Sequence, residues 1–512
     1  PVRLTMFERY VSFGPYGQWV AALAVTCCVG ISGVTVAWPT AAFPKMEDGS
    51  AGFDFSEWEK GWLACLPFTG AVISPLPVAY IMDRIGRRNT LHLSILLILG
   101  GWAIISFSSN IYMMCLARLM CGLWGGTEYI TVSIFVAEMV DPSIRGTLIS
   151  VTGMTLYIGA LYVSFISYMS YQTMSFLCAV PALCLFILFF FIPESPYFYL
   201  MHGKRKEAED AIIWLRGHCD KDEFKRIEDG VIEQSKNHGT FKEIVANKAN
   251  RNAFIMIEWF KIFSSCTANI VLFAYSTHLI PDSFVSAQDS NILLTILWVL
   301  AALVSSSIMD KFPRRTILSA SCVGTIALFA ITTVWYYLRE FTDVNVKTTT
   351  WIPLVTIIIG SFFEVIGIVN IPNVLKGEIF PINIKTKACA ISCMTANIFE
   401  TINVLYYYEI NYYIGEYFQF LKSVISASLC LYITIFHMFE TKGLDLETIQ
   451  KLLTGKMKVV NKEEDIKSEK KWFLCMIANI ELIYDIDYSS FATQRHSKFA
   501  VIVHLPISLL IN

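Results

Sequence analysis

Two short charged segments recur at corresponding places in the two halves of the sequence. Residues 83–88 read DRIGRR and residues 310–315 read DKFPRR, and each segment lies between two long apolar stretches. One acid and three bases at this spacing can form ion pairs, but they cannot lie in hydrocarbon, where each charge is costly. Each segment is therefore predicted to be a short water-facing loop. Their recurrence indicates a duplicated membrane bundle, an architecture that many transporters share.

A second pair of charged positions repeats with the same spacing. Glu138 and Arg145 are seven residues apart, as are Glu378 and Lys385. We interpret these charges as ion pairs whose acids and bases meet within each half, and which link the helix ends of the two halves when the cytoplasmic side of the bundle is closed. Exposed pairs contribute only ~0.2–1 kcal/mol each, but a partly desolvated network can bias two states of similar free energy. Alternatively, the basic loops only orient the helices in the membrane. The predicted network comprises Asp83, Arg84, Arg87, Arg88, Glu138, Arg145, Glu194, Asp310, Arg314, Arg315, Glu378, Lys385 and Glu440.

Several ionisable residues fall inside the apolar stretches, where an unpaired charge costs at least ~2.5 kcal/mol. Arg118 is predicted to face the bundle interior and to pair with an acid or a carbonyl as a structural brace. Glu258 and Lys261 are three residues apart, so they are expected to neutralise each other on one helical face. Three other acids lack a local partner and are interpreted either as proton-coupling carboxylates or as hydrogen-bonding groups between helices. They are Glu128, Glu364 and Glu400.

Polar residues in the predicted spans could bind a polyhydroxylated solute, which requires amide or hydroxyl partners and an aromatic face. Asn370 and Asn373 flank Pro372, where irregular backbone is expected to line a cavity. The alternative is that such side chains bond one helix to another, for ~0.6 kcal/mol on average. The candidates for the substrate pathway are Tyr157, Thr267, Asn269, Asn370, Asn373 and Asn397.

The composition is that of a membrane protein. Of the 512 residues, 55% are hydrophobic and 16% are charged, and mean hydropathy is +0.53, whereas a soluble protein carries roughly 25% charged residues. The formal net charge of −2 gives no basic surface for nucleic acid. The 14 cysteines show no metal-ligand spacing and no disulfide framework. No nucleophile–base pair or phosphate-binding loop is visible, so we expect neither an enzyme nor a cofactor or metal.

Twelve apolar stretches are long enough to span a membrane, which takes about 20 residues. The fold class predicted from them is an all-α membrane protein with twelve transmembrane helices in two pseudo-symmetric six-helix bundles. Residues 193–196 (PESP) follow the sixth stretch and residues 440–443 (ETKG) follow the twelfth, which supports the duplication. The stretches are 18–43, 60–82, 89–107, 110–137, 147–168, 173–192, 252–280, 290–309, 316–338, 351–375, 386–410 and 416–438.

The predicted organisation places all soluble segments on one side of the membrane. Lysine and arginine concentrate in the loops of one side, which should therefore be cytoplasmic together with both termini. The polar residues between the sixth and seventh stretches are expected to form amphipathic linker helices. The predicted segments are a cytoplasmic N-terminus (1–17), an N-terminal bundle (18–192), the linker (193–251), a C-terminal bundle (252–440) and a cytoplasmic tail (441–512), disordered from about 472.

The ordered set of motifs resembles the sugar porter family of the major facilitator superfamily. The resemblance covers residues from about 18 to 450, and residues 38–44 and 203–217 are similar to the insect facilitated trehalose transporter branch. It implies the major facilitator fold and transport by alternating access. The motifs are residues 83–88, Arg118 with Gly122 and Gly126, Glu138 with Arg145 and Gly146, residues 193–196, 310–315, 377–381 and 440–443.

The chain departs from the family at positions where the family contacts sugar. Gly153 stands in place of the fifth-span glutamine, residues 261–269 keep no glutamine, and Asn373 replaces the tenth-span tryptophan. Lys385 and Thr386 replace the second Arg-Gly motif. The first span carries no acid, whereas proton-coupled relatives in the family place an aspartate there, which favours a facilitator.

The resemblance implies facilitated (uniport) transport of trehalose or a hexose, through the plasma membrane. One alternative is a carrier for a different small polar solute, and another is a non-transporting sugar sensor that keeps the fold. The expected partners are the small-molecule solute and the lipid bilayer, without nucleic acid. The sequence does not indicate an oligomeric state.

Overall fold

The structure is a computed structural model, and the residues it describes belong to one compact unit, Pro1–Met457. Arg145 (its side chain), Asp310 and residues 472–512, on which predictions were made, lie outside the described part. Described residues are 16–219, 224–225, 227–229, 231, 240–309, 311–442, 448–449 and 452–453, without the side chains of 142–147, 149–150, 347 and 382–383.

The N-terminal half is a bundle of long apolar helices, as predicted. The second span is broken, because α2 and α3 meet at an angle of 52° beside Ser74. Helix α1 has a mean hydropathy of 2.1 over its most apolar window and is largely buried, so it lies inside the bundle. The helices are α1 (Gly17–Glu47), α2 (Glu57–Ile73), α3 (Pro75–Ile85), α4 (Arg87–Phe107), α5 (Ile111–Met139), α6 (Pro142–Ile166) and α7 (Tyr171–Leu188).

The C-terminal half repeats the pattern, with two broken spans. Thr267 adopts extended backbone between α12 and α13, and a π-helical turn precedes Asn370 in the span made by α16 and α17. Linker helices α8 (Pro196–Met201), α9 (Arg205–Arg216) and α11 (Phe241–Ala246) join the halves. The others are α12 (Lys248–Cys266), α13 (Ala268–Leu279), α14 (Ala287–Met309), α15 (Arg314–Phe341), η2 (Lys347–Thr349), α16 (Trp351–Glu364), η3 (Val365–Val369), α17 (Ile371–Ile379), α18 (Ile382–Leu405), α19 (Tyr407–Tyr413) and α20 (Tyr417–Phe436).

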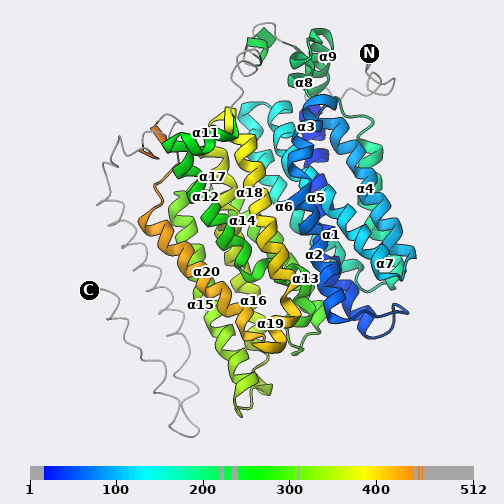
Figure 1. Cartoon of the computed structure of the whole chain (residues 1–512), viewed down its shortest axis with the longest axis vertical. Coiled ribbons are helices and arrows are strands. Elements are labelled where there is room, and N and C mark those ends of the chain that lie inside the picture. Colours follow the sequence, from blue (N-terminus) through cyan, green and yellow to red (C-terminus); the bar gives the residue numbers. More distant parts are fainter. Residues whose placement is uncertain are drawn as a thin grey trace. The chain divides into compact units, whose positions relative to one another are not determined.

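The all-α fold class is confirmed. Among the described residues, ten helical spans are long and apolar enough to cross a membrane, and the bent α2–α3 pair makes eleven. Helix α6, whose apolar part is Val151–Ile166, corresponds to the fifth predicted stretch (147–168) and brings the number of spans to twelve. The turns α3–α4 and α14–α15 lie at the same end as α8, α9 and α11, at the top of Figure 1. We call this the basic end, and the end where α1 stops and α2 begins the opposite end.

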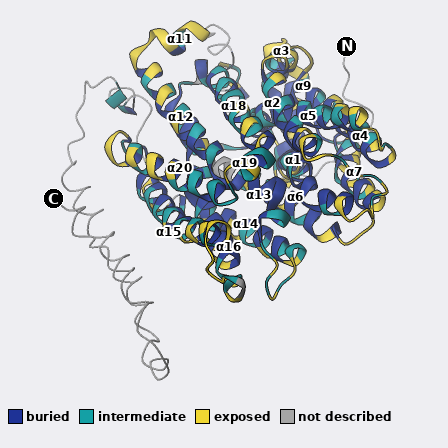
Figure 2. Ribbon diagram, turned by 60° about the horizontal axis from the view of Figure 1, so that its bottom comes forward, coloured by how far each residue is buried: buried dark blue, intermediate teal, exposed yellow. Residues whose placement is uncertain are grey.

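Burial follows from this arrangement. Figure 2 shows buried residues on α1, α13 and α14 in the interior, with exposed residues gathered on the outward faces of peripheral helices such as α4 and α7. Leu93, Phe107 and Phe176 are examples of exposed apolar side chains on those helices. In a membrane such faces contact lipid tails, which are as apolar as leucine. The long outward apolar faces therefore suit a bilayer.

Prolines inside the helices free carbonyl groups that other helices then satisfy. Proline has no N–H, so the carbonyl four residues earlier loses its helical partner. In α7, Pro181 frees the Leu177 carbonyl, which accepts a hydrogen bond of 2.9 Å from the Tyr162 hydroxyl of α6. In hydrocarbon an unsatisfied carbonyl costs several kcal/mol. Proline positions therefore help to decide which helices are bonded together.

Glycines set the closest approach between α1 and α6. A Cβ atom on Gly33 would lie 1.9 Å from the Leu156 carbonyl oxygen, and one on Gly159 would lie 2.0 Å from the Gly30 carbonyl oxygen. Small residues allow backbones to approach in this way, which maximises van der Waals contact between helices. These two glycines therefore hold α6 directly against α1, in the wall that faces the other half.

Candidate functional site

At the basic end, a buried carboxylate caps the start of α4. Glu194 is 2% exposed, and its Oε1 accepts hydrogen bonds from the backbone N–H groups of Arg87 (2.9 Å) and Arg88 (3.0 Å). These N–H groups have no partner within the helix, and a negative charge there is stabilised by the helix dipole. Burial raises the pKa of Glu194, while the N–H donors of Arg88 and Ser195 oppose that rise.

The C-terminal half repeats this cap. Glu440 accepts hydrogen bonds from the N–H groups of Arg314 (3.0 Å) and Arg315 (3.1 Å), at the start of α15. In both halves the second arginine reaches a carbonyl at the end of the last span: Arg88 donates to Phe189 (2.9 Å) and Arg315 to Thr434 (3.2 Å). The repeated sequence motifs are thus repeated caps.

The ion pairs at the basic end also repeat. Arg87 pairs with Glu138 (3.1 Å) and with Asp83 (3.6 Å), and Arg314 pairs with Glu378 (2.9 Å). Neighbouring hydroxyl groups complete each set, because Ser195 donates to Glu138 and Thr441 to Glu378. The Arg87–Glu138 and Arg314–Glu378 pairs each tie the fourth span of a half to the turn between its second and third spans, and Ser195 and Thr441 tie the same acids to the segment after the last span.

The ion pairs of Arg87 and Arg314 lie within one half each, as expected for the predicted network. A further ion pair joins Arg216 of the linker helix α9 to Asp141 (2.6 Å). The predicted link between the halves when this end is closed remains a prediction. Arg84 lies over the Tyr80 ring (4.2 Å), and the Lys385 amine donates to the Gly377 carbonyl (2.8 Å). The physical reason that these bonds lie within one half is distance, because each carboxylate bonds to the N–H and guanidinium groups at the start of the nearest helix. The network therefore stiffens each half.

One set of bonds between the halves lies at the opposite end. His278 Nε2 of α13 is 3.0 Å from the Glu47 carboxylate at the end of α1, and Lys60 of α2 pairs with the same carboxylate (3.1 Å). Tyr168 at the end of α6 donates to Asp289 of α14. These residues were absent from the predicted site. Nothing local in the sequence signals such partners, because His278 and Glu47 are 231 positions apart.

A further bond between the halves depends on a proline. Pro44 in α1 frees the Thr40 carbonyl, which accepts a hydrogen bond of 2.9 Å from the Thr277 hydroxyl of α13. We call the interface between the two halves the seam. In this seam, the Asn291 amide of α14 donates to the Ser164 hydroxyl of α6 (3.0 Å). Together these contacts close the opposite end of the seam between the two halves.

The Thr277 bond leads to a testable prediction. Thr277→Val leaves a buried acceptor unsatisfied only while the opposite end is closed, which costs about 1–3 kcal/mol. Hydrogen exchange of the last turn of α1, measured by mass spectrometry on the purified protein, should then rise by roughly fivefold or more. Adding Pro44→Ala supplies an N–H to Thr40 and should reverse the rise. The control is Thr333→Val, whose hydroxyl bonds only within its own helix. Unchanged exchange in Thr277→Val would contradict the prediction.

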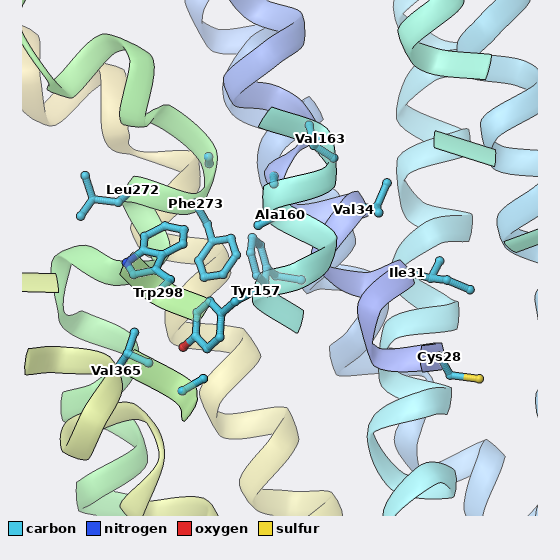
Figure 3. Packing of buried hydrophobic residues seen from close by; sticks show 14 of the residues in the cluster. Cys28, Ile31, Val34, Tyr157, Ala160, Val163, Leu272, Phe273, Trp298 and Val365 are labelled. Atoms are coloured by element: carbon cyan, nitrogen blue, oxygen red, sulfur yellow. The ribbon is translucent and has the colours of Figure 1, made fainter. Parts of the chain in front are cut away.

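In the middle of the seam, aromatic rings of both halves pack together. Tyr157 of α6 is buried and lies against Phe273 of α13 (ring centroids 5.7 Å apart) and Trp298 of α14 (5.8 Å). Figure 3 shows the Tyr157 ring directed from its helix toward these two rings. Its hydroxyl has no hydrogen-bond partner among the described residues. A predicted pathway residue therefore presents an aromatic face and a free hydroxyl at the seam.

Two other candidates lie at the break between α12 and α13. Thr267 donates to the Ser264 carbonyl (2.9 Å), so its hydroxyl stabilises the break. The Asn269 amide nitrogen is buried and has no partner among the described residues. The Glu364 carboxylate lies beside Thr267 and the first N–H groups of α13, where a helix start favours an anion. The break thus exposes polar groups to the bundle interior.

Asn370 and Asn373 follow the π-helical turn, in agreement with the irregular backbone expected there. The Asn370 amide donates to Ser305 of α14 (3.2 Å), and a Cβ on Gly153 of α6 would lie 3.8 Å from Asn370 Oδ1. Asn370 therefore faces the N-terminal half across the seam, opposite the glycine that replaces the family's glutamine. Asn397, by contrast, donates to the Cys393 carbonyl of its own helix (2.8 Å) and joins none of the other candidates.

Asn373 is the centre of a polar cluster that sequence reasoning missed. Its Oδ1 accepts from the Tyr129 hydroxyl of α5 (3.4 Å) and the Lys261 amine of α12 (3.4 Å). The Lys376 amine contacts the same Tyr129 hydroxyl. Lys376 was overlooked because the predicted span ended one residue before it. We call Tyr129, Lys261, Asn373 and Lys376 the lysine cluster.

The expected pairing of Glu258 with Lys261 is wrong. Lys261 turns to Asn373, and both carboxylate oxygens of Glu258 are buried without a hydrogen-bond partner among the described residues. Residues three apart on a helix lie close, but the packing of α17 against α12 offers Lys261 a partner in another direction. Of the other intramembrane acids, Glu400 accepts from Ser265 (3.1 Å) and Glu128 lies beside Ser32.

Arg118 bonds to two carbonyl oxygens, one of the two kinds of partner predicted for it. Its Nε donates to Leu63 of α2 and its Nη1 to Thr35 of α1, both at 2.7 Å. Pro67 and Pro39 are four residues after these carbonyls and leave both without a helical partner. One guanidinium therefore satisfies two proline-freed carbonyls on two different helices.

Comparison with known proteins agrees with this architecture. The family described as sugar (and other) transporter matches residues 24–453. The facilitated trehalose transporter Tret1 of Apis mellifera ligustica is 26% identical over 450 residues, which cover 86% of this chain and 88% of the relative. Tret1 of Polypedilum vanderplanki is 23% identical over 465 residues, covering 88% and 91%.

Solved structures show the same fold. The proton:xylose symporter XylE, bound to 6-bromo-6-deoxy-D-glucose, superposes with a TM-score of 0.69 at 17% identity, over 86% of this chain and 100% of XylE. An inward-open conformation of XylE from E. coli gives a TM-score of 0.68 at 18% identity, over 85% and 99%. With its repeated caps, its two six-span halves and a family match over most of its length, the chain belongs to the sugar (and other) transporter family of the major facilitator superfamily.

Proposed function

We propose that this sugar porter is a uniporter for trehalose or a hexose in the plasma membrane, with the basic end and both termini in the cytoplasm. The observation that carries the proposal is the seam itself. Free polar groups of Tyr157 and Asn269 and an aromatic face from Phe273 and Trp298 meet there, contributed by both halves. Such groups suit the hydroxyls and the C–H face of a sugar ring.

The distribution of bonds supports alternating access. Ion pairs and caps at the basic end lie within each half, so each half can move as a rigid body. The bonds of Thr277 and His278 join the halves at the opposite end, where exposed or partly exposed polar pairs are individually weak. Breaking a few such bonds while the caps persist would open the opposite end and present the seam to the other side of the membrane.

Uptake into liposomes tests this proposal. The purified chain is reconstituted, and the initial uptake of labelled trehalose and labelled glucose is measured against concentration. We expect saturable uptake of at least one of the two, unchanged when the proton gradient is collapsed. A steep loss on collapse would indicate proton coupling through Glu128, Glu364 or Glu400. Saturable uptake of another solute alone, or sugar binding without flux, would contradict the proposal and favour a different carrier or a sugar sensor, respectively.

A further inference from the structure

Two lysines lie inside membrane spans at the seam. Lys261 of α12 is 8% exposed and Lys376 of α17 is 4% exposed. Only two oxygen atoms separate their amines, because Asn373 Oδ1 contacts Lys261 and the Tyr129 hydroxyl contacts both Asn373 and Lys376. Lys376 also lies over the Tyr129 ring, 4.9 Å from its centroid. Since Tyr129 belongs to the N-terminal half, the cluster bridges the two halves.

Neither amine has a protein counter-ion within the described residues. No described carboxylate oxygen lies within the 4.0 Å ion-pair distance of either lysine, and their partners are a neutral amide and a neutral hydroxyl. Buried charges in proteins are ordinarily paired, because an isolated ammonium group in a low-dielectric interior is costly. In a membrane span that cost is higher still, because hydrocarbon does not solvate a charge. Two adjacent unpaired amines therefore point to a missing anion.

The nearby acids form no ion pair with either lysine within the described residues. Glu400 of α18 is within electrostatic range of both lysines but accepts a hydrogen bond from Ser265 of its own half. Glu258 precedes Lys261 by one turn, and its oxygens are buried away from any donor among the described residues. Glu128 is adjacent to Tyr129 in sequence but lies beside Ser32 of α1. The groups that a solute at the seam meets in this cluster are therefore the two ammonium groups.

The cluster is also accessible. Asn373 is an exposed residue even though its neighbours in α17, Pro372 and Leu375, are buried. Its position is the one where the resemblance places a tryptophan, and its Oδ1 contacts the buried Lys261 amine. Lysine amines bind carboxylate and phosphate oxygens as compact point charges.

We propose that the seam binds an anionic solute, a small polyol with one carboxylate or phosphate group, and that Lys261 and Lys376 hold its charge. The polyol part would contact the free hydroxyl of Tyr157 and the amide of Asn269. This rests on the proposed function, because it assumes that the solute binds at the seam. It adds sugar acids and sugar phosphates, as the preferred solutes, to the neutral sugars of the proposed function.

Competition experiments in liposomes test this inference. Initial uptake of labelled gluconate is compared with that of labelled glucose and trehalose, and each is competed with unlabelled gluconate, glucuronate and glucose 6-phosphate. We expect the anions to compete at concentrations at least tenfold lower than glucose does. An inside-positive potential should accelerate gluconate uptake and leave neutral sugar uptake unchanged. The carboxylate and phosphate competitors distinguish the two possible anionic groups.

Variants assign the effect to the cluster. Lys261→Gln and Lys376→Gln keep a hydrogen-bond donor and remove the charge, so each should lower the preference for anions over glucose by about tenfold, or 1.4 kcal/mol. Lys261→Arg and Lys376→Arg keep the charge and should keep most of the preference. Lys311→Gln, on an exposed loop, is the matched control. Thermal unfolding of each purified variant verifies that it is folded.

The outcomes separate this inference from the proposed function. Saturable uptake of neutral sugar with no preference for anions, or a preference that both glutamine variants retain, would overturn the inference and leave the carrier function standing. A third outcome is that gluconate raises the unfolding temperature of the purified protein, that the glutamine variants lose this effect, and that no saturable flux is measured. This outcome would support the anion site and contradict the carrier function. Saturable uptake of both glucose and gluconate, with gluconate uptake that depends on both lysines, supports the two together. Saturable gluconate uptake without uptake of glucose or trehalose supports the anion site and contradicts the proposed transport of a neutral sugar.

Discussion

Arg118→Leu is expected to lower the free energy of unfolding by about 3–6 kcal/mol, because hydrogen bonds to a charged group contribute ~1.5–3 kcal/mol each and two are lost. The substitution leaves the Leu63 and Thr35 carbonyls unsatisfied in the interior of the N-terminal half. The variant should therefore aggregate or unfold at much lower temperature in detergent. The measurement is thermal unfolding of the purified protein, followed by size-exclusion chromatography.

Rescue variants identify the cause of this loss. In the Arg118→Leu background, Pro39→Ala and Pro67→Ala each return an N–H to one of the two carbonyls, so the triple variant should recover a large part of the stability. Arg84→Leu is the matched control, since Arg84 is exposed and lies over a tyrosine ring. If the triple variant unfolds as early as Arg118→Leu, the arginine acts by some route other than its two carbonyl bonds.

Gly33→Ala is expected to be the second most disruptive single change. Its new Cβ would lie 1.9 Å from the Leu156 carbonyl oxygen, a backbone atom that cannot rotate away. Helices α1 and α6 must then separate by more than 1 Å, and overpacking of this kind costs about 1–3 kcal/mol or more. Because α6 carries Tyr157 to the seam, uptake should fall together with thermal stability. Both quantities are measured on the same purified variant.

Gly125→Ala provides the comparison for that variant. A Cβ on Gly125 of α5 would meet only Ser32 Oγ, at an ordinary contact distance of 3.8 Å. Alanine favours a helix interior over glycine by ~0.8–1.0 kcal/mol, so this variant should unfold at the same temperature or higher. Equal unfolding temperatures for Gly33→Ala and Gly125→Ala would show that α1 and α6 are not in close contact.

The residues that the sequence assigned correctly are those whose environment depends on near neighbours. Long apolar runs must be buried in protein or lipid, so the twelve spans follow from length and hydropathy alone. The charged segment at residues 83–88 must leave the hydrocarbon wherever the helices pack. Arg118 is the only basic residue in its apolar run, and an unpaired charge there is costly, so an acid or a carbonyl partner could be predicted. The irregular backbone around Pro372 follows from the proline itself.

Contacts between distant positions could not be obtained in this way. Glu258 and Lys261 have the spacing of a helical ion pair, yet the lysine turns to Asn373, 112 positions away. The bonds that close the opposite end, such as His278 with Glu47, join residues of different halves with no shared motif. Such choices depend on which side chains the packing brings within about 3 Å, and spacing along one helix carries no information on that.

The amino-acid sequence by itself determined the duplicated all-α membrane architecture, the family, and the charged loops at the basic end, because hydropathy, charge and motif order are properties of short segments. Only the tertiary structure decided that Glu194 and Glu440 cap the starts of α4 and α15, that proline-freed carbonyls are bonded by Arg118, Thr277 and Tyr162, and that two lysines without an ion-pair partner among the described residues share the seam. The physical reason is that a hydrogen bond or ion pair requires two side chains to lie within about 3 Å of each other, whatever their separation in the sequence. Its partner is chosen by how the helices pack, which no single stretch of sequence contains.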